Sequence, residues 1–244
     1  MLIFTVIILI LIIFAVVYVF LVMPRVTDGA DMDMQSADYA RRGVHSGGIA
    51  KNSIPALVAA RDLGYGIELE LSISSNGEIF INNCQVPTLK EVLTLIDGQV
   101  PLLLEIKSDK KWHAVCKRIC TLLDSYSGAF AVESSDPAVL SFFKKYRPRY
   151  ARGQILTAPS PKSKKKAIFS KKAFKNFTVL HLLTNIITRP DFIAIDGALM
   201  RKPAFLLATK LFGRVGFVRN VRNKRQYELC RSQGLYAIFE NITP

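Results

Sequence analysis

Two glutamates spaced two positions apart are the residues of this chain whose types and spacing could do chemistry. In the segment Ile67–Ile73 apolar residues alternate with polar ones, so Glu68 and Glu70 are predicted on one face of a strand. A third carboxylate, Glu105, lies in the apolar segment Val100–Lys107. Buried glutamates are rare unless they are paired or bind a metal. The three carboxylates therefore predict a site for one divalent cation, Ca²⁺ or Mg²⁺, or a salt-bridge cluster; a solvated sheet face is the alternative.

Strands interleaved with helices would position these carboxylates. The predicted strands are Tyr39–Arg42, Ile67–Ile73, Pro101–Lys107, Ala129–Glu133, Ala151–Leu156, Asp191–Asp196, Val215–Arg219 and Tyr236–Glu240, with Glu78–Ile81 continuing the second strand after an Asn76-Gly77 turn. Segments of helix length separate them, which predicts an α/β fold of the (β/α)8 type, a TIM barrel. An open doubly wound sheet is the alternative, but no glycine-rich phosphate loop follows any predicted strand.

The first 23 residues carry no charge and are long enough to span a bilayer. A secretory signal would show a basic start and a small-residue cleavage site, so Met1–Met23 is predicted to be a retained transmembrane helix. Residues 24–38 are predicted to be an acidic linker, and residues 39–244 one barrel domain. Arg25, Arg41 and Arg42 follow the helix and no basic residue precedes it, so the positive-inside rule places the domain of this single-pass protein in the cytoplasm.

The net charge of +14 is concentrated in one region of the chain. The segment from Lys144 to Lys175 holds twelve Lys or Arg residues and no acidic residue. Its second part, Lys162–Lys175, lies beside several phenylalanines, a composition that fits a segment bound to an anionic lipid surface. A solvated loop followed by an ordinary barrel helix is the alternative. The transmembrane helix and the lack of a recognition motif argue against nucleic acid as a partner.

Several segments resemble the glycerophosphodiester phosphodiesterase family, in the same order along the chain. They are Ala40-Arg-Arg-Gly43, Asn52-Ser53, Gly66-Ile-Glu-Leu-Glu70, Pro87-Thr-Leu-Lys-Glu-Val-Leu93, Leu104-Glu-Ile-Lys107, Arg189-Pro-Asp-Phe-Ile-Ala194 and Ile238-Phe-Glu-Asn241. The resemblance covers nearly the whole domain and implies a TIM barrel with its site at the carboxyl ends of the strands. It also implies hydrolysis of glycerophosphodiesters with a divalent cation and with two histidines as acid and base.

The resemblance implies a role for each matching residue. Glu68 and Glu105 match the metal-binding carboxylates of the family, and Glu70 stands where aspartate is usual. Arg42 and Lys107 match the residues that contact the phosphate.

Both histidine positions of the family are substituted in this chain. Arg41 and Asn82 stand there, and Arg219 stands near the end of the seventh predicted strand, where the family has tryptophan. Histidine exchanges protons near neutral pH and contributes about 10²–10⁴-fold as acid or base, which neither arginine nor asparagine can do. The resemblance therefore implies a catalytically degenerate member that binds a phosphodiester, a phospholipid head group or a partner. The alternative is an active metal-dependent phosphodiesterase with a rearranged acid and base, for which His45 is the candidate.

The substitution at Arg41 leads to one more expectation. A guanidinium carries five donors and can bridge two carboxylates. We expect Arg41 to pair with Glu68 or Glu105 and to take the place of the divalent cation.

Overall fold

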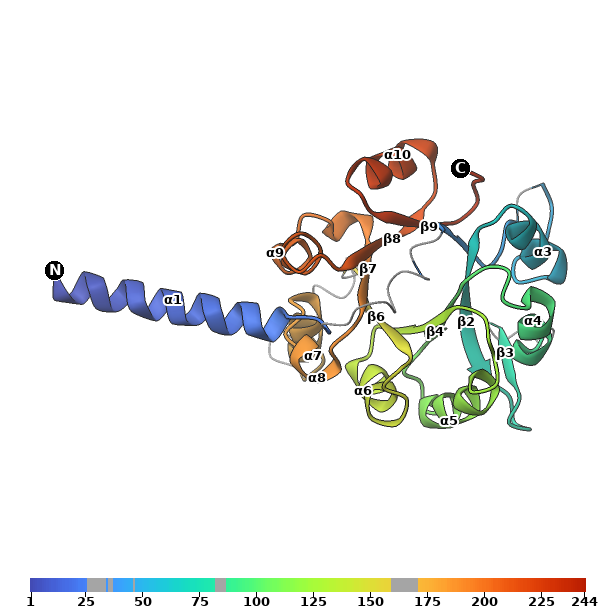
Figure 1. The fold of residues 1–244 in the computed structure, drawn as a ribbon, viewed down its shortest axis with the longest axis horizontal. Coiled ribbons are helices and arrows are strands. Elements are labelled where there is room, and N and C mark those ends of the chain that lie inside the picture. Colours follow the sequence, from blue (N-terminus) through green and yellow to red (C-terminus); the bar gives the residue numbers. More distant parts are fainter. Residues whose placement is uncertain (26–33, 35–36, 46, 82–86, 159–170) are drawn as a thin grey trace.

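A computed structural model describes residues 1–25, 34, 37–45, 47–81, 87–158 and 171–244 of the chain (Figure 1). Asn82, most of the predicted linker 24–38 and much of the basic segment Lys162–Lys175 lie outside the described residues.

The described elements alternate as the sequence predicts. The strands are β1 (Tyr39–Arg41), β2 (Gly66–Ile73), β3 (Ile79–Ile81), β4 (Leu102–Ile106), β5 (Phe130–Ser134), β6 (Ala151–Leu156), β7 (Phe192–Asp196), β8 (Val215–Val221) and β9 (Tyr236–Phe239). The helices are α1 (Leu2–Val22), α3 (Ile54–Asp62), α4 (Leu89–Ile96), α5 (Trp112–Leu123), α6 (Pro137–Tyr146), α7 (Lys171–Leu180), α8 (Asn185–Thr188), α9 (Pro203–Leu206) and α10 (Lys224–Ser232), with short turns η1 (Gly197–Leu199) and η2 (Leu207–Leu211).

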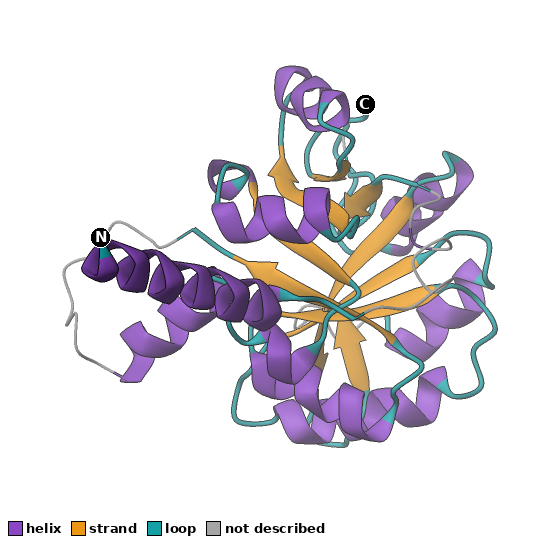
Figure 2. Cartoon of the chain, turned by 60° about the vertical axis from the view of Figure 1, so that its left-hand side comes forward, coloured by secondary structure: helices purple, strands orange, loops and turns teal. Residues whose placement is uncertain are grey.

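Eight parallel strands close into a barrel within the described residues. The order is β1, β9, β8, β7, β6, β5, β4, β2, and β1 also pairs with β2, which closes the ring. β3 pairs antiparallel with β2 and extends it outside the ring. The helices cover the outside of the ring (Figures 1 and 2). The TIM barrel predicted from the alternation of strands and helices is confirmed, and the open sheet is excluded.

Local sequence signals set the starts of several helices. Ser53 accepts a hydrogen bond from the backbone of Ala56 at the start of α3, and Asp136 caps α6. Thr88 and Glu91 form a capping box at the start of α4. These caps fix where each helix leaves the barrel wall.

The amino-terminal half of the barrel interior is filled by an apolar layer, here called the floor. Because successive strand residues point to opposite faces, every second residue of each strand enters the interior. The floor is built mainly from Tyr39, Leu103, Phe192, Phe217 and Ile238, all buried. Gly153 makes room for it, since a Cβ there would lie 2.1 Å from the Phe192 ring. The floor closes the barrel below the carboxyl ends of the strands.

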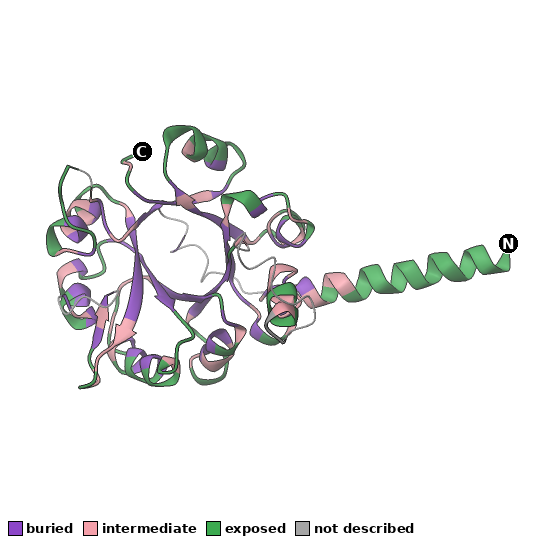
Figure 3. Cartoon of the chain, turned by 180° about the vertical axis from the view of Figure 1, so that it is seen from behind, coloured by how far each residue is buried: buried purple, intermediate pink, exposed green. Residues whose placement is uncertain are grey.

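The apolar helix α1 projects outward from the barrel wall, across the direction of the barrel axis (Figure 1). It is long and apolar enough to cross a membrane. Figure 3 shows it exposed along most of its length, and only its last turn is covered by the barrel.

Candidate functional site

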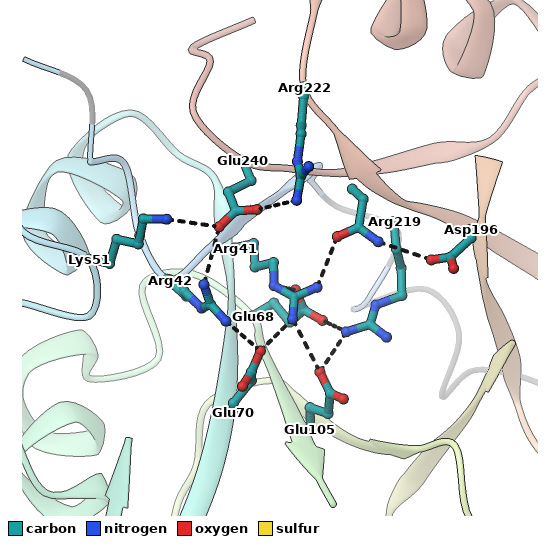
Figure 4. Close-up of polar contacts among 12 residues, drawn as sticks. Arg41, Arg42, Lys51, Glu68, Glu70, Glu105, Asp196, Arg219, Arg222 and Glu240 are labelled. Atoms are coloured by element: carbon teal, nitrogen blue, oxygen red, sulfur yellow. Dashed lines mark hydrogen bonds and ion pairs between the residues drawn. The ribbon is translucent and has the colours of Figure 1, made fainter. Parts of the chain in front are cut away.

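Above the floor, inward positions of five strands carry charged side chains. These residues are Arg41 of β1, Glu68 and Glu70 of β2, Glu105 of β4, Glu133 of β5 and Arg219 of β8. They lie toward the carboxyl ends of their strands, the end of the barrel at which TIM-barrel enzymes place their sites. Figure 4 shows how Arg41, Arg219 and the three carboxylates Glu68, Glu70 and Glu105 point toward one another. We call them the charged layer.

Strand register brings the carboxylates of the charged layer together. Glu70 of β2 is level with Glu105 of β4, and Glu105 is level with Glu133 of β5. One ligand oxygen each from Glu68, Glu105 and Glu133 lies within 4.8 Å of the others. Glu68, Glu70, Glu105 and Glu133 are all buried, which excludes the solvated sheet face considered from the sequence.

Arg219 joins two of these carboxylates from the opposite wall of the barrel. Its Nη2 atom donates to Glu68 Oε1 and to Glu105 Oε2, both at 2.5 Å. The Arg219 side chain is only 5 % exposed, and the surrounding carboxylates raise its pKa well above the ordinary value although burial opposes the charge. A permanently charged guanidinium thus lies between Glu68 and Glu105.

A β-bulge in β8 places two adjacent residues in the site. The register between β8 and β9 shifts between Val218 and Val221, and Asn220 adopts a positive φ of 59°. Asn220 therefore also turns to the interior, where its Oδ1 accepts from Arg41 at 3.2 Å and its Nδ2 donates to Asp196 at 3.0 Å. Bulges commonly redirect side chains in this way beside functional sites.

Arg41 lies in the middle of the charged layer. Its guanidinium donates a hydrogen bond to Glu70, and it forms longer ion pairs with Glu68 at 3.7 Å and Glu105 at 3.8 Å. Lys107 Nζ donates to the second oxygen of Glu70 at 2.6 Å. Burial raises the pKa of Glu70, but the hydrogen bonds from Lys107 and Arg41 outweigh it and lower that pKa to about 2.

A second group of cations surrounds Glu240 at the rim of the barrel. Arg42 donates to Glu240 at 3.3 Å and to Glu70 at 2.9 Å, so it links the rim to the charged layer. Lys51 and Arg222 reach Glu240 at 3.5 and 3.3 Å, and both are largely exposed. The barrel mouth therefore presents several cations to solvent around one buried carboxylate.

The carboxyls of the layer differ in their protonation. Burial raises the pKa of Glu133 well above its ordinary value; the Glu68 and Glu105 charges add to this rise, and only Arg219 opposes it. The pKa of Glu68 is lowered, because Arg219 and Arg41 together outweigh its burial. The structure thus favours an ionised Glu68 beside a protonated Glu133.

The carboxylates are grouped closely enough to hold a metal ion, but their present contacts do not fit one. Glu68, Glu105 and Glu133 supply the oxygen ligands that a hard cation prefers. However, Arg219 already takes the Glu68 and Glu105 oxygens, and Arg41 adds a second fixed charge. A divalent ion would require Arg219 to move away.

Each of the chain's three histidines is engaged away from the charged layer. The ring nitrogens of His45 lie 2.9 Å from the Gly43 carbonyl and 2.9 Å from Asn241 Oδ1. His113 stacks on Trp112 in α5, and His181 packs against Phe177. These contacts leave the carboxylates without a neighbouring imidazole among the described residues.

No role was predicted from the sequence for Glu133, and Arg219 was noted only as a substitution. Both end predicted apolar strands, Glu105 lies two residues before the end of its own, and a charge near the carboxyl end of a buried strand was the available signal. The predicted site residues Arg41, Arg42, Glu68, Glu70, Glu105 and Lys107 do come together in one network.

Solved structures of similar fold include several phosphodiesterases. A glycerophosphodiester phosphodiesterase from Parabacteroides distasonis is 16% identical, with a TM-score of 0.63 over 84% of this chain and 93% of that chain. A phosphodiesterase from Oleispira antarctica, solved with the product sn-glycerol-3-phosphate, gives the same identity and TM-score over 84% and 92%. A glycerophosphodiester phosphodiesterase from Agrobacterium tumefaciens is 14% identical, with a TM-score of 0.63 over 85% and 95%.

At such identities the likeness shows the fold. No protein-family model and no curated protein sequence matches this chain.

The unequal protonation of the layer predicts opposite effects for two glutamate-to-glutamine changes. Glu68→Gln removes a buried charge that Arg219 contacts directly and should lower the free energy of unfolding by about 3–5 kcal/mol. Glu133→Gln imitates the protonated carboxyl and should be tolerated. Because the pKa of Glu133 is raised in the folded state, its protonated carboxyl contributes fully to stability below the ordinary pKa of 4.5. This contribution is lost as the pH rises.

The stability of Glu133→Gln relative to the unsubstituted chain should therefore increase as the pH rises above 4.5. Urea unfolding of both variants across a pH series measures this. Equal losses of stability in the two variants at neutral pH would contradict the assignment of charges.

Proposed function

We propose that this chain is a membrane-tethered relative of the glycerophosphodiester phosphodiesterases that binds a phosphodiester or phospholipid head group without cleaving it. The observation that carries the proposal is the Arg219 guanidinium between Glu68 and Glu105. A guanidinium neutralises these carboxylates as a cation would. A catalytic metal ion acts as a Lewis acid on a phosphoryl oxygen and lowers the pKa of a bound water, and a guanidinium does neither.

The side chains around the charged layer support the proposal that the site does not catalyse proton transfer. Cleavage of a phosphodiester requires a base for the nucleophile and an acid for the leaving oxygen. We propose that Arg41 occupies the place of one of them; it is held by Glu70 and Asn220 and stays protonated. Asn82, proposed for the second place, does not titrate. His45 is held by two oxygens, so we give it no catalytic role.

The rim supports binding of an anion. Lys107, Lys51 and Arg222 are each about half exposed or slightly more, and each forms an ion pair with a single buried carboxylate. An incoming phosphate could take up their remaining donors while Arg42 contacts it from below. We therefore assign Arg42 and Lys107 to phosphate binding.

An active enzyme remains the second candidate, because Glu68, Glu105 and Glu133 together could hold a metal ion. In that case Arg219 would swing out when Ca²⁺ or Mg²⁺ enters, and Glu70 would join the cation site. The two candidates differ in whether divalent cations affect the unsubstituted protein.

We further propose that α1 anchors the chain as a single membrane span, with residues 24–38 as a linker and the barrel of residues 39–244 in the cytoplasm. The length and composition of α1 support the anchor. The lysines of Lys162–Lys175 would then meet the anionic lipids that the cytoplasmic leaflet carries.

Removal of Arg219 should expose a requirement for a cation. We expect Arg219→Ala to lower the free energy of unfolding by about 3–5 kcal/mol, because the Glu68 and Glu105 charges lose their shared partner. Millimolar Ca²⁺ or Mg²⁺ should restore part of the loss, as measured by thermal melts. Arg222→Ala, which removes an exposed arginine of the rim, is the matched control and should melt like the unsubstituted chain. Stabilisation of the unsubstituted chain by either metal would favour the enzyme instead.

A hydrolysis assay tests the absence of catalysis directly. Glycerophosphocholine and lysophospholipids are incubated with the protein and Ca²⁺ or Mg²⁺, and release of choline or phosphorylated product is followed. We expect no turnover, while glycerophosphocholine or sn-glycerol 3-phosphate raises the melting temperature, and less so for Lys107→Ala. Turnover that disappears in His45→Ala would establish a rearranged acid and base.

The basic segment should direct binding to anionic lipid. Without Met1–Met23, the chain should bind vesicles containing phosphatidylserine with strong salt dependence, because each Lys near such a surface contributes about 1 kcal/mol. Changing the lysines of Lys162–Lys166 to serine should weaken this binding, whereas the same change at Lys90, Lys110, Lys111 and Lys117 should not. Equal binding to phosphatidylcholine vesicles would refute the electrostatic attraction.

A further inference from the structure

Exposed apolar side chains gather around the base of α1. Among the described residues that follow α1, five of the ten exposed large apolar residues lie on α7, α8, α9 and η2. They are Phe174 (70 % exposed), Phe177 (53 %), Ile187 (58 %), Leu206 (41 %) and Leu211 (62 %), which we call the apolar collar. The other five are spread over the rest of the described barrel surface, as single exposed apolar residues normally are.

The junction between α1 and the barrel is fixed by several polar contacts. Asn185 Nδ2 donates to the Val22 carbonyl at 2.8 Å, and Arg189 donates to the Met23 carbonyl at 2.7 Å. Arg25 bonds through its backbone to the Pro190 carbonyl at 3.1 Å and forms an ion pair with Asp191 at 3.5 Å. These contacts satisfy the carbonyls at the end of α1 and hold the helix against α8.

The length of the apolar helix α1 determines how close the apolar collar lies to a membrane that α1 crosses. Its 21 residues rise about 31 Å, which just matches a hydrocarbon core of about 30 Å. However, the last turn, from Tyr18 to Val22, is already packed on α8 and η2. If the whole apolar helix is immersed, the barrel surface beside this turn must reach the level of the lipid.

We infer that the apolar collar is a membrane-docking surface that lies in the interfacial region of the bilayer crossed by α1. The inference rests on the proposed membrane span and adds a second, peripheral contact to it. Arg189 fits such a position, since its guanidinium lies 5.3 Å from the centre of the Phe20 ring while its Nη1 donates to the Met23 carbonyl.

Docking through the collar fixes the orientation of the barrel. α1 leaves the wall across the direction of the barrel axis (Figure 1). The axis would therefore lie along the membrane surface, and the barrel mouth would open sideways. A ligand could then reach the mouth parallel to the plane of the lipid head groups.

Tryptophan fluorescence with brominated lipid tests the docking surface in the full chain. Trp112, the only tryptophan, is first changed to Phe. Single tryptophans are then placed at Phe177 and Leu211 in the collar, at Leu63 just after α3 as the exposed apolar control on the far side, and at Phe14 within α1. Each variant is reconstituted in phosphatidylcholine nanodiscs with or without bromine on the acyl chains, and circular dichroism checks that each is folded.

We expect brominated lipid to remove most of the emission at positions 14, 177 and 211 and to leave position 63 unchanged. Quenching at position 14 alone would overturn the docking surface while leaving the membrane span intact. No quenching at position 14 would overturn the span, and the docking surface with it. Protection of positions 177 and 211 from both brominated lipid and aqueous iodide would show that protein covers the collar, and would also overturn the inference.

Discussion

The architecture of this barrel mouth depends on the neutralisation of carboxylates that the strands bury. Glu68 and Glu105 are fixed by strand register, so their charges cannot move apart or turn to water. An ion in such surroundings requires an opposite charge at contact distance, because the protein interior solvates it poorly. Arg219 supplies that charge from the other side of the ring. It thereby links strands that are not neighbours in the sheet.

The apolar floor and the charged layer both result from the two-residue alternation of side chains along the strands. On β8, Phe217 belongs to the floor and Arg219, two residues later, to the charged layer; β1 repeats this with Tyr39 and Arg41. The floor excludes water from below, which strengthens every ion pair above it. Within the layer, Glu68 and Glu70 each keep a guanidinium partner in direct contact.

The sequence predicted the fold well and the site only in part. Alternation, helix caps and the Asn76-Gly77 turn are local signals, and the corresponding elements form within a few residues of the predicted bounds. The pairing of Arg219 with Glu68 joins residues 151 positions apart, and no local pattern encodes it. It depends on strand order, on inward alternation and on the bulge in β8. The contact of Arg189 with the end of α1 also joins distant parts of the chain, so it could not be predicted from a local pattern.

The shared hydrogen bonds of Arg219 have a consequence for how the sequence can change over evolutionary time. Because one nitrogen serves both Glu68 and Glu105, loss of Arg219 would leave both buried carboxylates without their shared partner, whereas loss of one glutamate would leave Arg219 paired with the other. Substitutions at these positions should therefore be epistatic, with each tolerated only when a partner has already changed. A lineage carrying this triad would gain a metal-binding site only through a less stable intermediate that lacks Arg219, and this cost would tend to preserve the guanidinium.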